Sequence, residues 1–175
     1  MWSFDFSFLK RHAVNIVLTV ILFFVAAQKI PSIIAMYKAQ GEVAQTAIAF
    51  DLSNQSVSIP LRTKHILVFW ATWCGPCKIE LGRINRMIQS GEIAAESVLA
   101  VSIREDTKLV SSFVNEQKFL FKVAVDQTGQ VAELYKISGT PTILFIGADQ
   151  MVNWMTTGLS PSLEFRVRSF LKEEK

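Results

Sequence analysis

The sequence predicts an α/β domain with a mixed central sheet and helices on both faces. Strand-like and helix-like segments alternate through the middle of the 175-residue chain, which is typical of α/β proteins. Near the C-terminus two apolar runs flank a turn, which indicates a strand pair that closes the domain. Half of the residues are apolar, enough for one good core, so we expect one main domain with additional segments.

The charge pattern argues against nucleic acid as a partner. The formal net charge is +3, and basic and acidic residues are spread along the whole chain. A protein that binds nucleic acid gathers Lys and Arg in a stripe that neutralises successive phosphates. The sequence has no such stripe, so we expect no nucleic-acid partner.

The N-terminal segment predicts a membrane anchor. Residues 13–27, AVNIVLTVILFFVAA, carry no charge, and KRH directly precedes them. Positive residues normally remain on the cytoplasmic side of a membrane. We therefore expect a cytoplasmic tail over residues 1–12, a single-pass anchor over residues 13–36 and a linker over residues 37–46, with the rest of the chain outside the cytoplasm.

A cleaved signal peptide is the alternative. The strictly apolar core is shorter than the roughly 20 residues that span a bilayer, and Val25 and Ala27 fit a small-residue cleavage site. Apolar residues resume after Lys29, whose long stem can reach the membrane interface. We favour the uncleaved anchor, which makes the membrane itself a partner through the N-terminal helix.

The globular domain is expected over residues 47–175. It opens with AIAFDLSNQSVSIPL, in which two short apolar runs flank Ser53-Asn54-Gln55, and this pattern predicts an N-terminal β-hairpin. Residues 65–70, HILVFW, are strand formers and predict a strand.

A change of period after this strand predicts a helix. Apolar residues then recur at helical spacing, namely Cys77, Leu81, Ile84 and Ile88. The pattern stops near Gly91, where we expect the helix to end. Cys77 therefore faces the core side of the helix.

The following residues predict a strand, a helix and a strand. Residues 97–103, SVLAVSI, form an apolar run of the buried kind. Residues 107–117 predict a helix capped by Asp106. The residues of this helix expected to face inward are Leu109, Val110, Phe113 and Val114. Residues 121–126, FKVAVD, predict the next strand.

The C-terminal part predicts a short helix, two strands and a final helix. The short helix covers residues 130–137, and the strands cover residues 143–146 and 152–158. Ser160 and Pro161 are expected to open the last helix, because proline suits a first helical turn.

Both cysteines of the chain, Cys74 and Cys77, lie in the stretch WATWCGPCKIE. A structural zinc site needs about four N or S ligands, and only His12 and His65 could add to the pair, so we expect no metal. A purely structural disulfide is disfavoured, because so small a loop restricts the unfolded chain little. A redox role remains, and we expect no cofactor.

The spacing of the pair suits thiol–disulfide exchange. A strand-to-helix junction places Cys74 at a helix N-terminus, where unpaired N–H groups and the helix dipole favour a thiolate. Cys77 follows one helical turn later and can attack a mixed disulfide formed by Cys74. Pro76 suits the first turn and Gly75 adds no bulk. These features predict Cys74 as the nucleophile and Cys77 as the resolving cysteine of a redox-active disulfide.

The motif FWATWCGPCK resembles the active site of thioredoxins, and GTPT at residues 139–142 resembles their cis-proline loop. The order of elements from residue 47, with the N-terminal anchor, resembles the TlpA/ResA branch of membrane-anchored thioredoxin-like reductases. This resemblance implies that Pro141 is cis and lies against the cysteine pair. It also implies that Thr140 offers backbone groups to a substrate segment, while Trp73 covers the site or serves ordinary packing.

Three positions near the cysteine pair, Val68, Glu80 and Gly82, correspond to positions with characteristic residues in these families. Cytoplasmic thioredoxins have a buried Asp where this chain has Val68. The TlpA/ResA branch has an acidic residue where this chain has Glu80, which could take the proton of Cys77. The alternative for Glu80 is a surface pair with Arg83, also at i+3. Gly82 stands where many relatives have a helix-kinking proline. The sequence therefore does not decide whether the helix is kinked at this position.

The resemblance implies a thiol–disulfide oxidoreductase at the outer face of the bacterial cytoplasmic membrane. It would reduce disulfide-containing proteins, such as those in cytochrome c or copper-site assembly, and a membrane-embedded thiol donor would recharge it. One alternative is a disulfide-forming or isomerising enzyme of the same fold. Another is a Cu(I) carrier, which a Met just before the pair would favour, but Thr72 occupies that position.

Overall fold

A computed structural model describes residues 13, 15–25, 27, 30 and 40–172. The chain divides into two compact units, residues 1–35 and 36–175. The predicted tail over residues 1–12 lies outside the described residues, as do parts of the predicted anchor and linker. Within the described ranges, no helix has both the length and the apolar character needed to cross a membrane. The anchor therefore stays a prediction.

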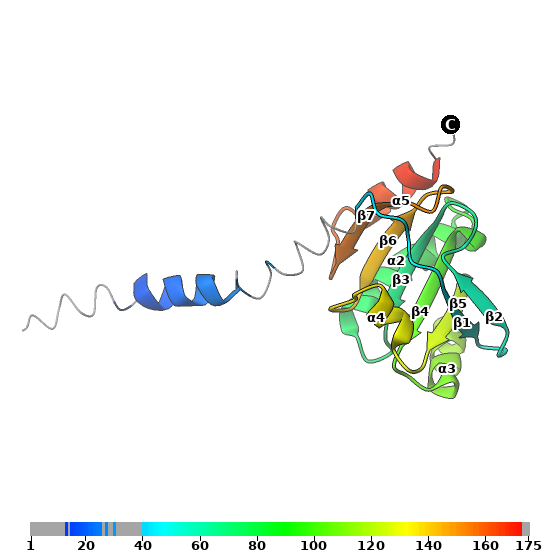
Figure 1. The fold of residues 1–175 in the computed structure, drawn as a ribbon, viewed down its shortest axis with the longest axis horizontal. Helices are drawn as coiled ribbons and strands as arrows, with labels where there is room; N and C mark the ends of the chain where they lie inside the picture. Colours follow the sequence, from blue (N-terminus) through cyan, green and yellow to red (C-terminus); the bar gives the residue numbers. More distant parts are fainter. Residues whose placement is uncertain (1–12, 14, 26, 28–29, 31–39, 173–175) are drawn as a thin grey trace, which may run out of the picture. The chain divides into compact units, whose positions relative to one another are not determined.

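The second unit is built on a seven-stranded mixed sheet with the order β2-β1-β5-β4-β3-β6-β7. Figure 1 shows these strands with helices on both sides of the sheet. β3 pairs with β4, and β4 with β5, in parallel, whereas the other neighbouring strands pair antiparallel. The strands are β1 (Ala47–Asp51), β2 (Ser56–Ile59), β3 (His65–Trp70), β4 (Val98–Ile103), β5 (Lys122–Asp126), β6 (Thr142–Ile146) and β7 (Val152–Thr157). The expected mixed α/β sheet is confirmed.

Two apolar clusters lie on opposite faces of this sheet. One contains buried residues of the helices α2, α3 and α5, and the other contains those of α4 and the β1–β2 hairpin. The helices are α2 (Gly75–Gln89), α3 (Thr107–Gln117), α4 (Gln130–Leu134) and α5 (Leu163–Lys172), with a 3-10 turn η1 (Ala95–Ser97) before β4. The sheet is thus covered on both faces, as the sequence predicts.

The central strand β3 is buried along its whole length. Successive side chains of a strand point to opposite faces. Val68 and Trp70 accordingly lie in one cluster, and Leu67 and Phe69 lie in the other. This burial on both faces explains why HILVFW is a continuous apolar run instead of an alternating one.

The predicted hairpin forms between β1 and β2. The Asp51 carboxylate accepts the backbone N–H groups of Ser53 and Gln55, both at 2.9 Å. Asn54 adopts a left-handed backbone with φ of 61°, a conformation that Asn tolerates better than most residues. β1 then joins the main sheet through the pair Phe50 and Val125.

Three expectations about helices need correction. Leu109 is 54% exposed, because α3 packs through Val110, Phe113 and Val114, and Leu109 lies to the side of that face. The short helix α4 ends at Leu134, three residues earlier than expected. The last helix begins at Leu163 and not at Ser160, whose backbone N–H is bound by a side chain described below.

Candidate active site

The cysteine pair lies where β3 passes into α2. Cys74 is the N-cap residue of α2, with extended backbone angles, and its sulfur accepts the backbone N–H of Cys77 at 3.2 Å. Pro76 lies in the first turn, as the sequence predicts. The Cys74 N–H donates to the carbonyl oxygen of Ala71 at 3.2 Å, which closes the turn before the helix. The sequence therefore places its sulfur at a helix N-terminus.

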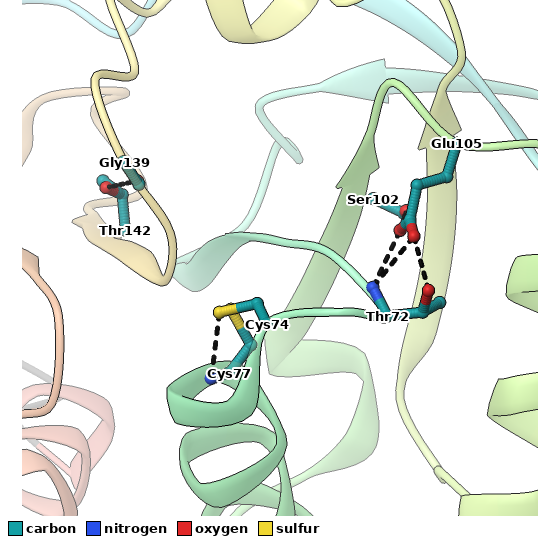
Figure 2. The surroundings of a disulfide bond; sticks show 7 residues. All are labelled: Thr72, Cys74, Cys77, Ser102, Glu105, Gly139 and Thr142. Atoms are coloured by element: carbon teal, nitrogen blue, oxygen red, sulfur yellow. Dashed lines mark hydrogen bonds between the residues drawn. A yellow bond between two sulfur atoms is a disulfide. The ribbon is translucent and has the colours of Figure 1, made fainter.

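Cys74 and Cys77 form a disulfide, with 5.2 Å between their Cα atoms. Figure 2 shows the bond at the start of α2, with the Cys77 N–H directed at the Cys74 sulfur. Cys74 is 5% exposed and Cys77 is fully buried. When the pair is reduced, the same N–H and the helix N-terminus favour the thiolate of Cys74. Cys74, the less deeply buried of the two cysteines, is the one predicted to be the nucleophile.

The loop before β6 lies at the same edge of the sheet. Thr142, the first residue of β6, pairs with Phe69 of β3, so Pro141 just before it lies at the sheet edge where the chain leaves β3 toward Cys74. The bond between Thr140 and Pro141 is cis, as the resemblance implies. The Thr142 hydroxyl donates to the Gly139 carbonyl oxygen at 2.7 Å and holds the loop (Figure 2).

The remaining predicted site residues differ in accessibility. Trp73 is 74% exposed, so ordinary core packing does not explain it. Thr140 is half-buried and Pro141 is buried, while Gly75 and Pro76 are exposed at the helix start. The substrate-binding roles of Trp73, Thr140 and Pro141 stay predictions.

Glu80 is fully buried one turn beyond Cys77. Its Oε1 accepts the Ser160 backbone N–H at 2.6 Å, and its Oε2 is 3.1 Å from the Arg83 guanidinium. The pair with Arg83 therefore exists, but the idea that it is a surface pair is wrong, because the carboxylate has no exposed area. The role of Glu80 in proton transfer stays a prediction.

Arg83 extends this ion pair into a cluster. It also binds Glu164 at 3.1 Å and donates to the carbonyl oxygens of Ser160 at 2.9 Å and Pro161 at 3.3 Å. These bonds tie α2 to the turn before α5. α2 runs without interruption through Gly82, where an added Cβ would meet only the Arg86 side chain at 3.8 Å.

Glu105 is a second buried carboxylate near the site, and it was not predicted from the sequence. Both of its oxygens accept hydrogen bonds from Thr72, and Oε2 also accepts the Ser102 hydroxyl at 2.6 Å (Figure 2). One feature of the sequence could have pointed to Glu105: it follows a predicted buried strand, β4, which runs parallel to the strand before Cys74. Carboxyl ends of parallel strands meet at one edge of a sheet, where functional residues gather.

A model of the AhpC/TSA family matches residues 41–155, which contain the disulfide and the Pro141 loop. The chain belongs to the AhpC/TSA family. It is 30% identical over 159 residues to a thioredoxin-like protein of Haemophilus influenzae, a match that covers 90% of this chain and 88% of the relative.

Two further comparisons place this AhpC/TSA protein among redox enzymes. It is 37% identical over 81 residues to the thiol-disulfide oxidoreductase ResA of Oceanobacillus iheyensis, covering 46% of this chain and 42% of that protein. The solved structure of a candidate thiol:disulfide interchange protein, DsbE, from Chlorobium tepidum matches with a TM-score of 0.66 and 27% identity, over 75% of this chain and 97% of that one.

The thioredoxin-like fold and the resemblance to ResA are therefore confirmed. The names of the curated relatives and the Cys74–Cys77 disulfide assign this AhpC/TSA protein to the thiol–disulfide oxidoreductases. The match to ResA of Oceanobacillus iheyensis spans less than half the length of that protein. Substrates, the direction of electron flow and location consequently belong to the proposal that follows.

Proposed function

We propose that this protein is a membrane-tethered reductase of protein disulfides that works outside the cytoplasm. The observation that carries the proposal is the Cys74–Cys77 disulfide at the N-terminus of α2, beside the cis-proline loop of Pro141. A helix N-terminus lowers the cost of a thiolate, which is the attacking form of cysteine. A buried second cysteine lies one helical turn away, ready to complete the exchange.

The reaction proceeds in two exchanges. The Cys74 thiolate attacks one sulfur of a substrate disulfide; that bond breaks, a mixed disulfide forms, and the other substrate sulfur leaves as a thiolate. Cys77 then loses its proton and attacks the Cys74 sulfur. The mixed disulfide breaks, the Cys74–Cys77 bond forms, and the second substrate sulfur leaves. Two electrons have passed to the substrate, and the protein is oxidised.

Glu80 and the loop residues complete this proposal. Glu80, one turn beyond Cys77, receives the proton that Cys77 must release. Exposed Trp73 and the backbone at Thr140 and Pro141 contact the substrate segment. The oxidised pair then needs a dithiol donor in the membrane, since each cycle consumes two electrons.

Exchange with the reduced protein tests the activity. Reduced protein, freed of excess dithiol, should reduce a disulfide-bonded model protein such as insulin. Cys77→Ser should accumulate the mixed disulfide on Cys74, whereas Cys74→Ser should neither react nor trap a partner. Failure of the wild-type protein to transfer electrons would contradict the proposal.

Equilibration with glutathione tests the direction of electron flow. We expect a potential near that of thioredoxin, about −270 mV, because the Gly-Pro dipeptide between the cysteines is that of thioredoxins. A potential near that of strongly oxidising enzymes, about −120 mV, would favour the disulfide-forming alternative. The redox state of the pair in cells should then be mainly reduced for the proposed function.

The location is tested with a reporter that is active only outside the cytoplasm. Fused after Lys175, it should be active, because Lys10 and Arg11 precede the uncharged N-terminal stretch. The protein should also remain in the membrane fraction after a carbonate wash. A shortened form that begins at Gln28 would identify a cleaved signal peptide in place of the anchor.

A further inference from the structure

Glu105 is a buried carboxylate that takes no part in the exchange steps. Only 6% of it is exposed. Its two oxygens accept the Thr72 backbone N–H at 3.1 and 2.9 Å, and they also accept the hydroxyls of Thr72 and Ser102. Figure 2 shows these donors converging on the one carboxylate. A carboxylate is an acceptor with two oxygens and can hold all of these donors at once.

The position of Glu105 is itself fixed by its neighbours on both sides. The backbone N–H of Arg104 donates to the Asp126 carbonyl oxygen at 2.8 Å, which ties the residue before Glu105 to β5. Asp106, the residue after it, caps α3 and accepts the Lys108 N–H at 2.8 Å. Glu105 is thus a firm attachment point at the ends of β4 and β5.

Thr72 is the residue that this attachment holds. It lies two residues beyond the end of β3 and two before Cys74, and it is bound to Glu105 through both main chain and side chain. The next residue, Trp73, is 74% exposed, so packing does little to hold it. Besides the Cys74–Ala71 backbone bond, the Thr72–Glu105 bonds are therefore what orients the chain that enters Cys74.

We propose that Glu105 is a positioning residue for thiol–disulfide exchange, which sets the placement of Trp73 and Cys74 against the Pro141 loop by holding Thr72. Glu105 acts through Thr72 and does not contact the substrate. This inference rests on the proposed function, because its first measurement is the rate of protein disulfide reduction. Its second measurement, the reactivity of reduced Cys74 with a small alkylating reagent, requires no protein substrate.

Three variants separate positioning from simple support of the fold. Glu105→Ala removes the acceptor of Thr72 altogether. Glu105→Gln keeps one acceptor oxygen in nearly the same shape. Asp126→Asn is the matched control, because Asp126 is also a buried carboxylate at a strand end, 4% exposed, but it accepts the Ala132 N–H at 2.8 Å on α4.

Each variant is compared with the wild type at one pH for thermal unfolding, disulfide reduction and alkylation by iodoacetamide. In Glu105→Ala we expect kcat/KM for insulin reduction to fall by about tenfold to a hundredfold, because reacting groups held out of place lose the benefit of orientation. Alkylation of Cys74 should instead become faster by roughly severalfold, since a released loop exposes the sulfur. Glu105→Gln should show a smaller change, because its amide oxygen still accepts the Thr72 N–H.

Asp126→Asn should leave both the kcat/KM and the alkylation rate near those of the wild type, even if it lowers the melting temperature. The proposal is overturned if Glu105→Ala alkylates and reduces disulfides like the wild type. The proposal is also overturned if Glu105→Ala and Asp126→Asn both lose activity in proportion to their loss of stability. If Glu105→Ala does not fold, Glu105→Gln decides by the same two measurements. Should wild-type protein fail to reduce insulin, the proposed function fails, while alkylation still reports on the loop.

Discussion

Ser160 donates its backbone N–H to the Glu80 carboxylate at 2.6 Å, although 80 residues separate them in the sequence. The backbone N–H of Gly158, two residues earlier, donates to the Pro141 carbonyl oxygen at 2.7 Å. The segment from Gly158 to Ser160 therefore connects the cis-proline loop to α2, which Cys74 caps and which contains Cys77. Glu80 is placed by this connection and by Arg83, and not only by its position along α2.

The first prediction concerns Glu80 as the proton acceptor of Cys77. Glu80→Gln should keep the fold and slow disulfide exchange by up to roughly a hundredfold, the lower end of what general acid–base assistance contributes. A nearby carboxylate raises the pKa of a thiol through repulsion of like charges, so the apparent thiol pKa values should fall in the variant. Stopped-flow exchange and thiol titration measure both effects. Wild-type rates with an unchanged titration would leave Cys77 without this proton acceptor.

The second prediction concerns Arg83, which holds the buried Glu80 carboxylate. Arg83→Ala should lower the free energy of unfolding by about 3 kcal/mol, because it leaves a buried charge without its cation. Glu164→Gln is the matched control: it removes a partner of the same guanidinium, but one whose side chain is 43% exposed. Surface pairs contribute about 0 to 1 kcal/mol, so this control should unfold almost like the wild type.

Urea denaturation of the oxidised proteins measures the difference between these two variants. Equal losses in Arg83→Ala and Glu164→Gln would mean that the Glu80 pair contributes no more than the exposed one. In that case, the Ser160 N–H alone would account for the placement of Glu80.

The third prediction concerns the unequal accessibility of the cysteines. In reduced protein, alkylation should label Cys74 before Cys77, because Cys74 caps α2 and retains some exposure while Cys77 is fully buried. The apparent pKa of the labelled thiol should lie below about 8.5, the ordinary value, because the helix N-terminus favours its thiolate. Peptide mass mapping after alkylation across a pH series identifies the labelled residue. Preferential labelling of Cys77 would reverse the two roles.

Local pattern in the sequence predicted much of this site, because local physics decides those features. The run HILVFW, the period of α2 and the Asp106 cap depend on neighbours a few residues away, and each appears as predicted. The contacts of Ser160 and Glu105 could not be read in this way. They join segments 80 and 33 residues apart, and only the folded sheet brings them together.

Leu109 shows a different reason for failure. An apolar residue at helical spacing satisfies the periodic pattern whether or not a neighbouring element reaches it. α3 packs on the sheet through Val110, Phe113 and Val114, and Leu109 lies to the side of that contact. The side chain of Leu109 is left in solvent, which no pattern within the helix itself could reveal.

The last prediction concerns the pH dependence of stability through His65, which begins β3 and is fully buried. Burial lowers the pKa of this imidazole below its ordinary value near 6.5, and a hydrogen bond with the Thr63 carbonyl oxygen opposes the shift only partly. Well above pH 6.5 the ring is neutral in both the folded and the unfolded state, and it does not affect stability. As the pH falls further, the unfolded chain binds a proton that the folded chain resists, so stability decreases until the pH passes the folded pKa.

The free energy of unfolding of the oxidised protein should therefore decrease between pH 7 and pH 5, above the range in which most carboxylates titrate. His65→Gln is the matched variant, because an amide can still accept the Leu61 N–H and donate to Thr63 as the ring does. At pH 7 the free energy of unfolding of His65→Gln should be equal to or lower than that of the wild type. Between pH 7 and pH 5, however, this free energy should change little in the variant. Urea denaturation at closely spaced pH values compares the two slopes. Parallel slopes would assign the pH dependence to a group other than His65.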